Sequence, residues 1–440
     1  MPTAGPERFG EGDAHTARPR GRRSRRALVG ALSALALAPV AGCSPGDDEP
    51  TQAPATQARA GVVGQIEATL QRRASAVRRG DRRDFARTLT GPATWRREQL
   101  TWFDNLSRLP VGRLSYRVDP ATLVRDGDHY WVVVEQRLRL DGFDAAPVST
   151  PDRLRFRPAS GGERYLVTSV SDPAWEERHG VRPEPWELGP IEVVAGAGVL
   201  GVFDAGSVGS APNLIAAVER GIADVDAALP VEWPRSVVLY ALSDSRFLSG
   251  IGDLPGGDPE QVDAVAFPVW AGLDDQRPVG TRIVLHPRML GAAGEERERL
   301  IRHELVHVAV GERDDRVPVW FSEGLAEYVS VRPLAPQDRV VSGEALQLAA
   351  DGLPRLPSDE GFNESRSAAH YGLAWWACEY LARNYGEPVL WWLLEELGRP
   401  GVDPDAVLEE GFGLDSDALA QKAAQLLLAA YGAPAEASER

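Results

Sequence analysis

Hydrophobic positions in the first part of the chain change from a helical to an alternating spacing. Residues 62–90 carry apolar side chains at helical spacing with a break near Gly80-Asp81, and this pattern predicts two helices. Later segments alternate apolar and polar residues in the manner of strands, at 113–118, 129–140, 152–158 and 164–171. Helices followed by antiparallel strands predict an α+β domain over residues 61–189.

The second part of the chain mixes short apolar segments with longer helical ones. Strands are predicted at 191–206, 236–243, 264–270 and 282–287. Helices are predicted at 211–229, 295–310, 319–330, 367–400 and 415–432. This order predicts a second domain over residues 190–432, mainly helical with a small sheet, and a frayed tail over 433–440. The expected fold class of the whole chain is therefore α+β.

Residues 1–42 have the pattern of an export signal. A basic front runs from Arg18 to Arg26, and an apolar stretch from Ala27 to Ala41 follows it. That stretch is shorter than the roughly 20 residues that a membrane-spanning helix needs, so we interpret the segment as a cleaved signal peptide.

The signal ends in a pattern that resembles the lipoprotein box of bacteria. Val40-Ala41-Gly42 precedes Cys43, which the resemblance implies is lipidated and becomes the mature N-terminus. Ser24-Arg25-Arg26 also resembles a twin-arginine export signal. The alternative is a signal peptide followed by an ordinary thiol. Residues 43–60, rich in Pro, Ala, Thr and Gln, would form a flexible tether, and the protein would face outward from the cell membrane, anchored by lipid.

Charge argues against a nucleic-acid partner. Asp and Glu number 64 against 48 Lys and Arg, a formal net charge of −16, and basic residues cluster only at the extreme N-terminus. The second cysteine, Cys378, lies in an apolar helical pattern without a partner, so no disulfide framework is expected.

The segment Ile301 to Ser330, IRHELVHVAVGERDDRVPVWFSEGLAEYVS, carries the candidate chemistry. In a helix, His303 and His307 are four residues apart and lie one above the other, where two imidazoles can hold one metal ion, and zinc accepts such ligands. Glu304 is rotated about 100° from His303 and can face a metal-bound water.

A second helix supplies further carboxylates. Glu323 and Glu327 lie one turn apart on one of its faces. We assign Glu323 as the third ligand because Gly324 beside it would let the two helices approach closely. Glu327 would accept the free ring N–H of a ligating histidine. Three protein ligands leave the fourth position of a zinc site to water.

His303-Glu304-x-x-His307 followed by WFSEGLAEY resembles the gluzincin metallopeptidases, most closely the peptidase-MA-like bacterial proteins, over about residues 191–431. The resemblance implies a zincin-type fold, zinc bound by His303, His307 and Glu323, and Glu304 as general base. It also implies a substrate-binding edge strand, at 264–270 or 282–287.

A later tyrosine or histidine that stabilises the oxyanion is a further feature that this resemblance implies. Tyr371 matches that position best, and His370 is the alternative. The sequence lacks the G-x-M-E-N stretch of gluzincin aminopeptidases. Residues 61–189 resemble the cone-shaped domains of the nuclear-transport-factor-2-like superfamily, which would provide either a ligand pocket or a packing domain.

The sequence therefore predicts a lipid-anchored zinc peptidase that acts on peptide or protein substrates outside the cytoplasm. One alternative is a non-catalytic envelope protein that uses the same fold for binding or scaffolding. Another is zinc-dependent hydrolysis of a different amide, such as one in the cell wall. Retention of Glu304 beside a full ligand set favours hydrolysis, because a purely structural site needs no base.

Overall fold

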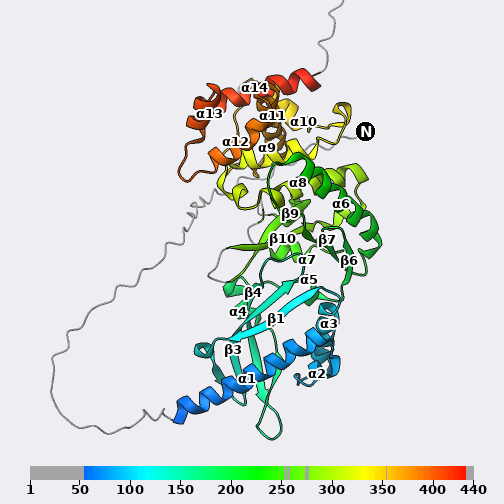
Figure 1. Ribbon diagram of the computed structural model, residues 1–440, viewed down its shortest axis with the longest axis vertical. Coiled ribbons are helices and arrows are strands. Elements are labelled where there is room, and N and C mark those ends of the chain that lie inside the picture. Colours follow the sequence, from blue (N-terminus) through cyan, green and yellow to red (C-terminus); the bar gives the residue numbers. More distant parts are fainter. Residues whose placement is uncertain (1–53, 252–253, 255–257, 273–276, 353, 433–440) are drawn as a thin grey trace, which may run out of the picture. The chain divides into compact units, whose positions relative to one another are not determined.

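The computed structural model (Figure 1) has an α+β fold, as the sequence predicts. It describes residues 54–251, 254, 258–272, 277–352 and 354–432. The predicted signal peptide, Cys43 and the tail at 433–440 lie outside the described residues. None of the helices that are described combines the length and apolar character needed to cross a membrane.

Three helices open the described chain: α1 (Pro54–Arg79), α2 (Arg82–Ala86) and α3 (Ala93–Leu106). The predicted break is present, because Gly80 takes a left-handed φ of 68° and Asp81 caps α2 by accepting a hydrogen bond from the backbone N–H of Asp84. Helix α1 begins at Pro54, inside the segment 43–60 whose composition predicts a tether.

An antiparallel sheet follows these helices, in the order β1-β3-β4-β5, with β2 paired to β3. Its strands are β1 (Val111–Val118), β2 (Val124–Asp126), β3 (His129–Leu140), β4 (Val148–Pro158) and β5 (Tyr165–Ser169). Alternate apolar residues of β3, such as Val132 and Val134, are buried against Ile66 and Phe85 of the helices. Two short helices, α4 (Pro173–His179) and α5 (Pro185–Leu188), lead out of the sheet.

A second, mixed sheet has the order β6-β7-β8-β10-β9. Its strands are β6 (Glu192–Gly196), β7 (Val199–Phe203), β8 (Val237–Ala241), β9 (Ala264–Trp270) and β10 (Pro278–Leu285), and α6 (Ala211–Ala228) and α7 (Arg246–Gly250) join them. The three central strands are parallel, and the outer strands β6 and β9 are antiparallel to their neighbours. Strand β9 is at the edge and β10 is not, so 264–270 is the edge segment of the two candidates.

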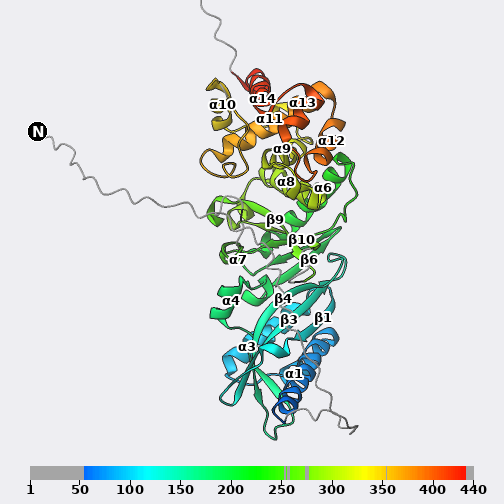
Figure 2. The ribbon, with the colours of Figure 1, turned by 90° about the vertical axis from the view of Figure 1, so that its left-hand side faces the viewer.

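Strands β7 and β8 at the centre of this second sheet are buried at every residue, which explains why they are continuously apolar. In Figure 2 the sheet lies between helices α6 and α8 and the strands of the first sheet. Side chains of one face, including Leu239 and Ile283, pack with α6 and α8 (Gly294–Val310). Side chains of the other face, including Tyr240 and Val284, join the core of the first sheet and its helices. The second sheet thus lies between the helical layer and the N-terminal part.

The junction between the two sheets holds a buried ion pair. Asp144, in the loop after β3, lies 2.8 Å from the Nη2 atom of Arg282 on β10, at an angle that is not that of a hydrogen bond. Their side chains are 1% and 3% exposed. The backbone N–H of Ala145 donates to the carbonyl of Val279 at 2.7 Å. The β9–β10 hairpin is therefore held directly by the N-terminal sheet.

The remaining helices form the C-terminal part: α9 (Val319–Ser330), α10 (Gly343–Ala350), α11 (Ser367–Tyr385), α12 (Pro388–Leu397), α13 (Pro404–Phe412) and α14 (Ser416–Tyr431). The single helix predicted over 367–400 is divided into α11 and α12 at Gly386, which has a φ of 87°.

One glycine has a different role from the one that the sequence predicts. A Cβ atom on Gly324 would overlap the carbonyl oxygen of Ala374, so this glycine lets α9 approach α11 and not α8. The glycine that serves α8 is Gly221 of α6, where a Cβ would lie 2.8 Å from the Cδ1 atom of Leu305.

Candidate metal centre

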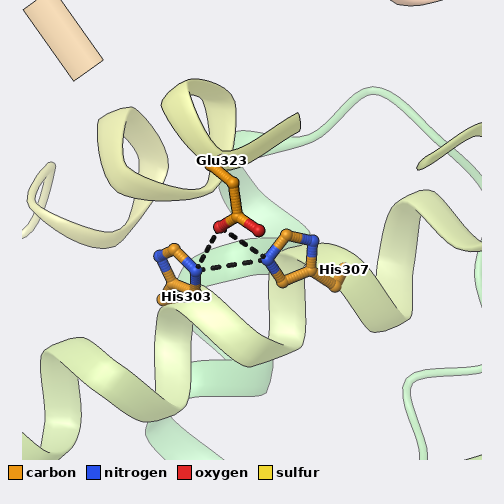
Figure 3. Close-up of side chains that lie close together, drawn as sticks. All are labelled: His303, His307 and Glu323. Carbon is orange, nitrogen blue, oxygen red and sulfur yellow. Dashed lines mark hydrogen bonds and ion pairs between the residues drawn. The ribbon is translucent and has the colours of Figure 1, made fainter. Parts of the chain in front are cut away.

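Helix α8 separates its core residues from its polar residues by rotation around the helix axis. Ile301 and Leu305 are fully buried in the core, whereas His303 and His307 point toward α9 (Figure 3). The helix ends at Gly311, whose φ of 61° is accessible to glycine, and a short 3₁₀ helix, η5 (Gly311–Arg316), then leads to α9.

The two rings converge with Glu323 from α9. The Nε2 atom of His303 is 3.1 Å from Oε2 of Glu323, and the Nε2 atom of His307 is 3.5 Å from the same oxygen. The two Nε2 atoms are 3.2 Å apart. One ligand atom from each residue thus lies within 4.8 Å of the others, a group that could hold a metal ion.

The outer nitrogen of each ring faces a carboxylate. The Nδ1 atom of His307 lies 2.7 Å from Oδ2 of Asp314, and the other oxygen of this carboxylate, Oδ1, accepts a 2.5 Å hydrogen bond from the hydroxyl of Ser322. The Nδ1 atom of His303 lies 3.2 Å from Oε1 of Glu327, as an ion pair without hydrogen-bond geometry. If the hydrogen of each neutral ring lies on Nδ1, facing these carboxylates, each Nε2 turns a lone pair inward toward Glu323.

Two inward lone pairs and a carboxylate oxygen form a set of three acceptors that a cation would satisfy. In a tetrahedral zinc site with bonds of about 2.0–2.1 Å, neighbouring ligand atoms are about 3.3–3.4 Å apart. The separations among His303, His307 and Glu323 bracket that value, so these residues fit a zinc ion without rearrangement.

The charges of this cluster are strongly coupled. Burial lowers the pKa of His303, but the neighbouring carboxylates of Glu323 and Glu327 outweigh burial and raise the pKa to about 9. The pKa of His307 is raised likewise by Asp314 and Glu323 against the effect of burial. Burial raises the pKa of Glu327, but His303 and Arg299 lower it to about 2. Because a metal ion must displace the ring protons, its affinity should fall as the pH is lowered.

Glu304 stands beside this group, on the side of β9. Its side chain is 6% exposed and lines the same cleft as the two histidines. Burial raises the pKa of the Glu304 carboxyl, while the imidazoles and a backbone hydrogen bond from Ala266 act in the opposite direction. A carboxyl with a raised pKa is suited to accept and return a proton.

The structure places Tyr371, and not His370, at the cleft. The Tyr371 hydroxyl lies 3.3 Å from Oδ1 of Asn363, and its ring centroid is 6.1 Å from that of His303. His370 instead bonds through Nδ1 to the carbonyl of Phe362 at 2.8 Å and is not among the residues that line the cleft.

The cleft itself measures about 1050 Å³. Helix α8 and residues Ala264 to Ala266 of the edge strand β9 line it. Residues from the chain after α9, including Leu334 and Val340, line the cleft as well. The metal group and Glu304 are thus reached from a groove that is bordered by the free edge of a sheet.

Three residues of the site are not predicted by the sequence. They are Asp314, which holds His307; Arg299, which pairs with Glu327; and Asn363, which holds Tyr371. A helical-face argument would find Arg299, because it lies four residues before His303 on α8. Asp314 lies in a turn where the sequence offers no periodicity to read.

Replacing Asp314 tests its hold on His307. We expect Asp314→Ala to weaken zinc binding about 10–100-fold, because the ring loses the partner that fixes its tautomer and orientation. Competition with a chelator of known affinity measures this change. Asp315→Ala is the matched control, since Asp315 is exposed and does not line the cleft. Equal zinc affinity in both variants would contradict the role of Asp314.

Comparison with known proteins adds no relative: no protein-family model matches the chain, and no curated protein matches it significantly.

Proposed function

We propose that this protein is a zinc-dependent peptidase that is anchored by lipid outside the cytoplasm. The observation that carries the proposal is the convergence of His303, His307 and Glu323 beside Glu304 in an open cleft. Three donors without a fourth protein ligand are typical of catalytic zinc, whereas structural zinc is usually closed by four.

Each residue of the cleft has a role in this proposal. A zinc ion, when bound, acts as a Lewis acid and lowers the pKa of water. Glu304 accepts the proton of the attacking water and later delivers it to the leaving amine. The Tyr371 hydroxyl donates to the oxygen that becomes negative on the substrate carbonyl. Asp314 and Glu327 keep the two imidazoles oriented.

Strand β9 would hold the substrate. It is the outermost strand of its sheet, so an extended peptide could pair with its outer edge near Ala264, beside Ala266, whose N–H donates to Glu304. This binding mode recognises backbone and places few demands on side chains, which suits a peptidase with an unfolded substrate.

Metal removal tests the proposal on the full chain. We expect the zinc-loaded protein to cleave denatured protein or members of a peptide library, chelation to stop cleavage, and added zinc to restore it. Mass spectrometry of the products measures this. A zinc-loaded protein that cuts nothing would contradict catalysis and favour the binding or scaffolding alternative. Cleavage confined to cell-wall amides in a parallel panel would contradict peptidase specificity.

A further inference from the structure

One face of α8 lines the cleft over most of the helix, and we call this face the floor. Residues at every fourth position of two adjacent rows all line it: Glu295, Arg299, His303 and His307, and beside them Glu296, Leu300 and Glu304. From Glu296 to Glu304 the helix rises about 12 Å, at 1.5 Å per residue. The floor therefore extends well beyond the metal group, toward the first turn of α8.

The far end of this floor is negatively charged. Glu295 and Glu296 are exposed and take part in no hydrogen bond or ion pair of their side chains within the described ranges. Asp338, at the end of the 3₁₀ helix η6 (Pro336–Asp338), lines the same cleft and is also exposed and unpaired in the part of the chain that is described.

The positive charge of the cleft is already neutralised. Arg299 is the one arginine among the described residues that line it, and no lysine lines it. Its guanidinium pairs with Glu327 and donates to the carbonyl of Val340 at 3.2 Å. An acidic side chain of a substrate would meet no free cation on this floor, whereas a basic one would meet unpaired carboxylates.

We propose, on the basis of the peptidase function above, that this cleft selects peptides with a lysine or arginine three to four residues from the bond that is cut. An extended peptide advances about 3.3 Å per residue, so the roughly 12 Å between Glu304 and Glu296 corresponds to that spacing. Glu295, Glu296 and Asp338 are the residues that determine this specificity.

The two glutamates also lie in the first turn of α8, where carboxylates stabilise a helix by its dipole. That role alone would not explain Asp338, which belongs to a different element and lines the same cleft. Measuring both peptide binding and thermal unfolding on the same variants distinguishes an effect of these carboxylates on helix stability from an effect on peptide specificity.

The experiment measures binding on the zinc-loaded Glu304→Gln protein by fluorescence anisotropy, so that no probe is cut. The probes are labelled decapeptides that differ only in carrying Lys, Gln or Glu four residues from the centre. We expect the Lys peptide to bind about tenfold more tightly than the Glu peptide at low salt, and the ratio to shrink as salt screens the charges.

Glu295→Gln with Glu296→Gln should reduce this ratio to about twofold, and Asp338→Asn should reduce it in part. Glu298→Gln is the control: it removes one carboxylate from the same helix, but Glu298 pairs with Arg220 at 2.6 Å and does not line the cleft. Equal binding of all three peptides, or an equal loss in the Glu298 variant, would overturn the proposal.

The result is distinguishable from failure of the proposed function. The zinc-loaded wild type could prefer the Lys peptide and yet cut no amide. That result would contradict the peptidase proposal and support a cleft that binds basic peptides. Cleavage by the wild type without regard to charge would leave the peptidase proposal standing and would overturn the inference about substrate class.

Discussion

The Glu304→Gln protein should bind zinc as tightly as the wild type and cleave peptides about 10²–10⁴-fold more slowly, the usual contribution of a general base. Glutamine keeps the size of the side chain and can still accept the backbone hydrogen bond of Ala266, but it cannot take a proton from water. Zinc content and kcat/KM measured on one preparation check this expectation.

Two outcomes would contradict the role of Glu304. If the variant cleaves at the wild-type rate, another group removes the proton. If it loses zinc, Glu304 supports the metal group and the loss of activity says nothing about a base. Glu327→Gln is a useful comparison, because Glu327 faces Nδ1 of His303 and should affect zinc affinity more than proton transfer.

Replacing Asp144 with alanine should lower the free energy of unfolding by about 3–5 kcal/mol, the largest stability effect that we expect of a single substitution in this chain. The change leaves Arg282 charged and 3% exposed between the two sheets. It also removes the acceptor for the backbone N–H of Leu140, which bonds to Oδ2 of Asp144 at 2.8 Å. Urea unfolding at a fixed zinc concentration measures the difference.

Asp141→Ala is the control for this loop. Asp141 is an exposed partner of Arg139, so its removal should cost less than about 1 kcal/mol. The double variant Asp144→Leu with Arg282→Met should recover part of the lost stability, because it removes the guanidinium that Asp144→Ala leaves without this partner, although the N–H of Leu140 still lacks its acceptor. A double variant as unstable as Asp144→Ala would show that packing or the bond of Leu140, and not the charge of Arg282, is responsible.

The sequence predicts the convergence of His303, His307 and Glu323 because their geometry is local. His303 and His307 are four positions apart, which fixes their relation on a helix, and the short turn before α9 keeps Glu323 close to α8. Strands are also predicted by the alternation of apolar and polar residues, as β3 shows. The order of the strands in the sheet cannot be predicted in this way, because the place of β9 at the edge depends on packing among segments far apart in the sequence.

The choice between His370 and Tyr371 shows the same limit. Neighbouring residues on a helix differ by about 100° in direction, so one faces the cleft only if the helix has a particular rotation. That rotation depends on contacts such as the close approach of Ala374 to Gly324. The sequence of α11 is apolar on most sides of the helix, so its hydrophobic periodicity does not predict this rotation.

The outer edge of β9 also affects whether copies of this protein associate at high concentration. An edge strand that pairs with a substrate peptide could also pair with a strand from another copy of the protein. Repeated pairing of this kind extends sheets into fibres. Pro268 lies within β9 and offers no N–H to such a ladder, and only Ala264 to Ala266 face the cleft. The stretch open to edge-to-edge pairing is therefore short, so molecules packed side by side should remain separate at concentrations that a longer edge would not tolerate.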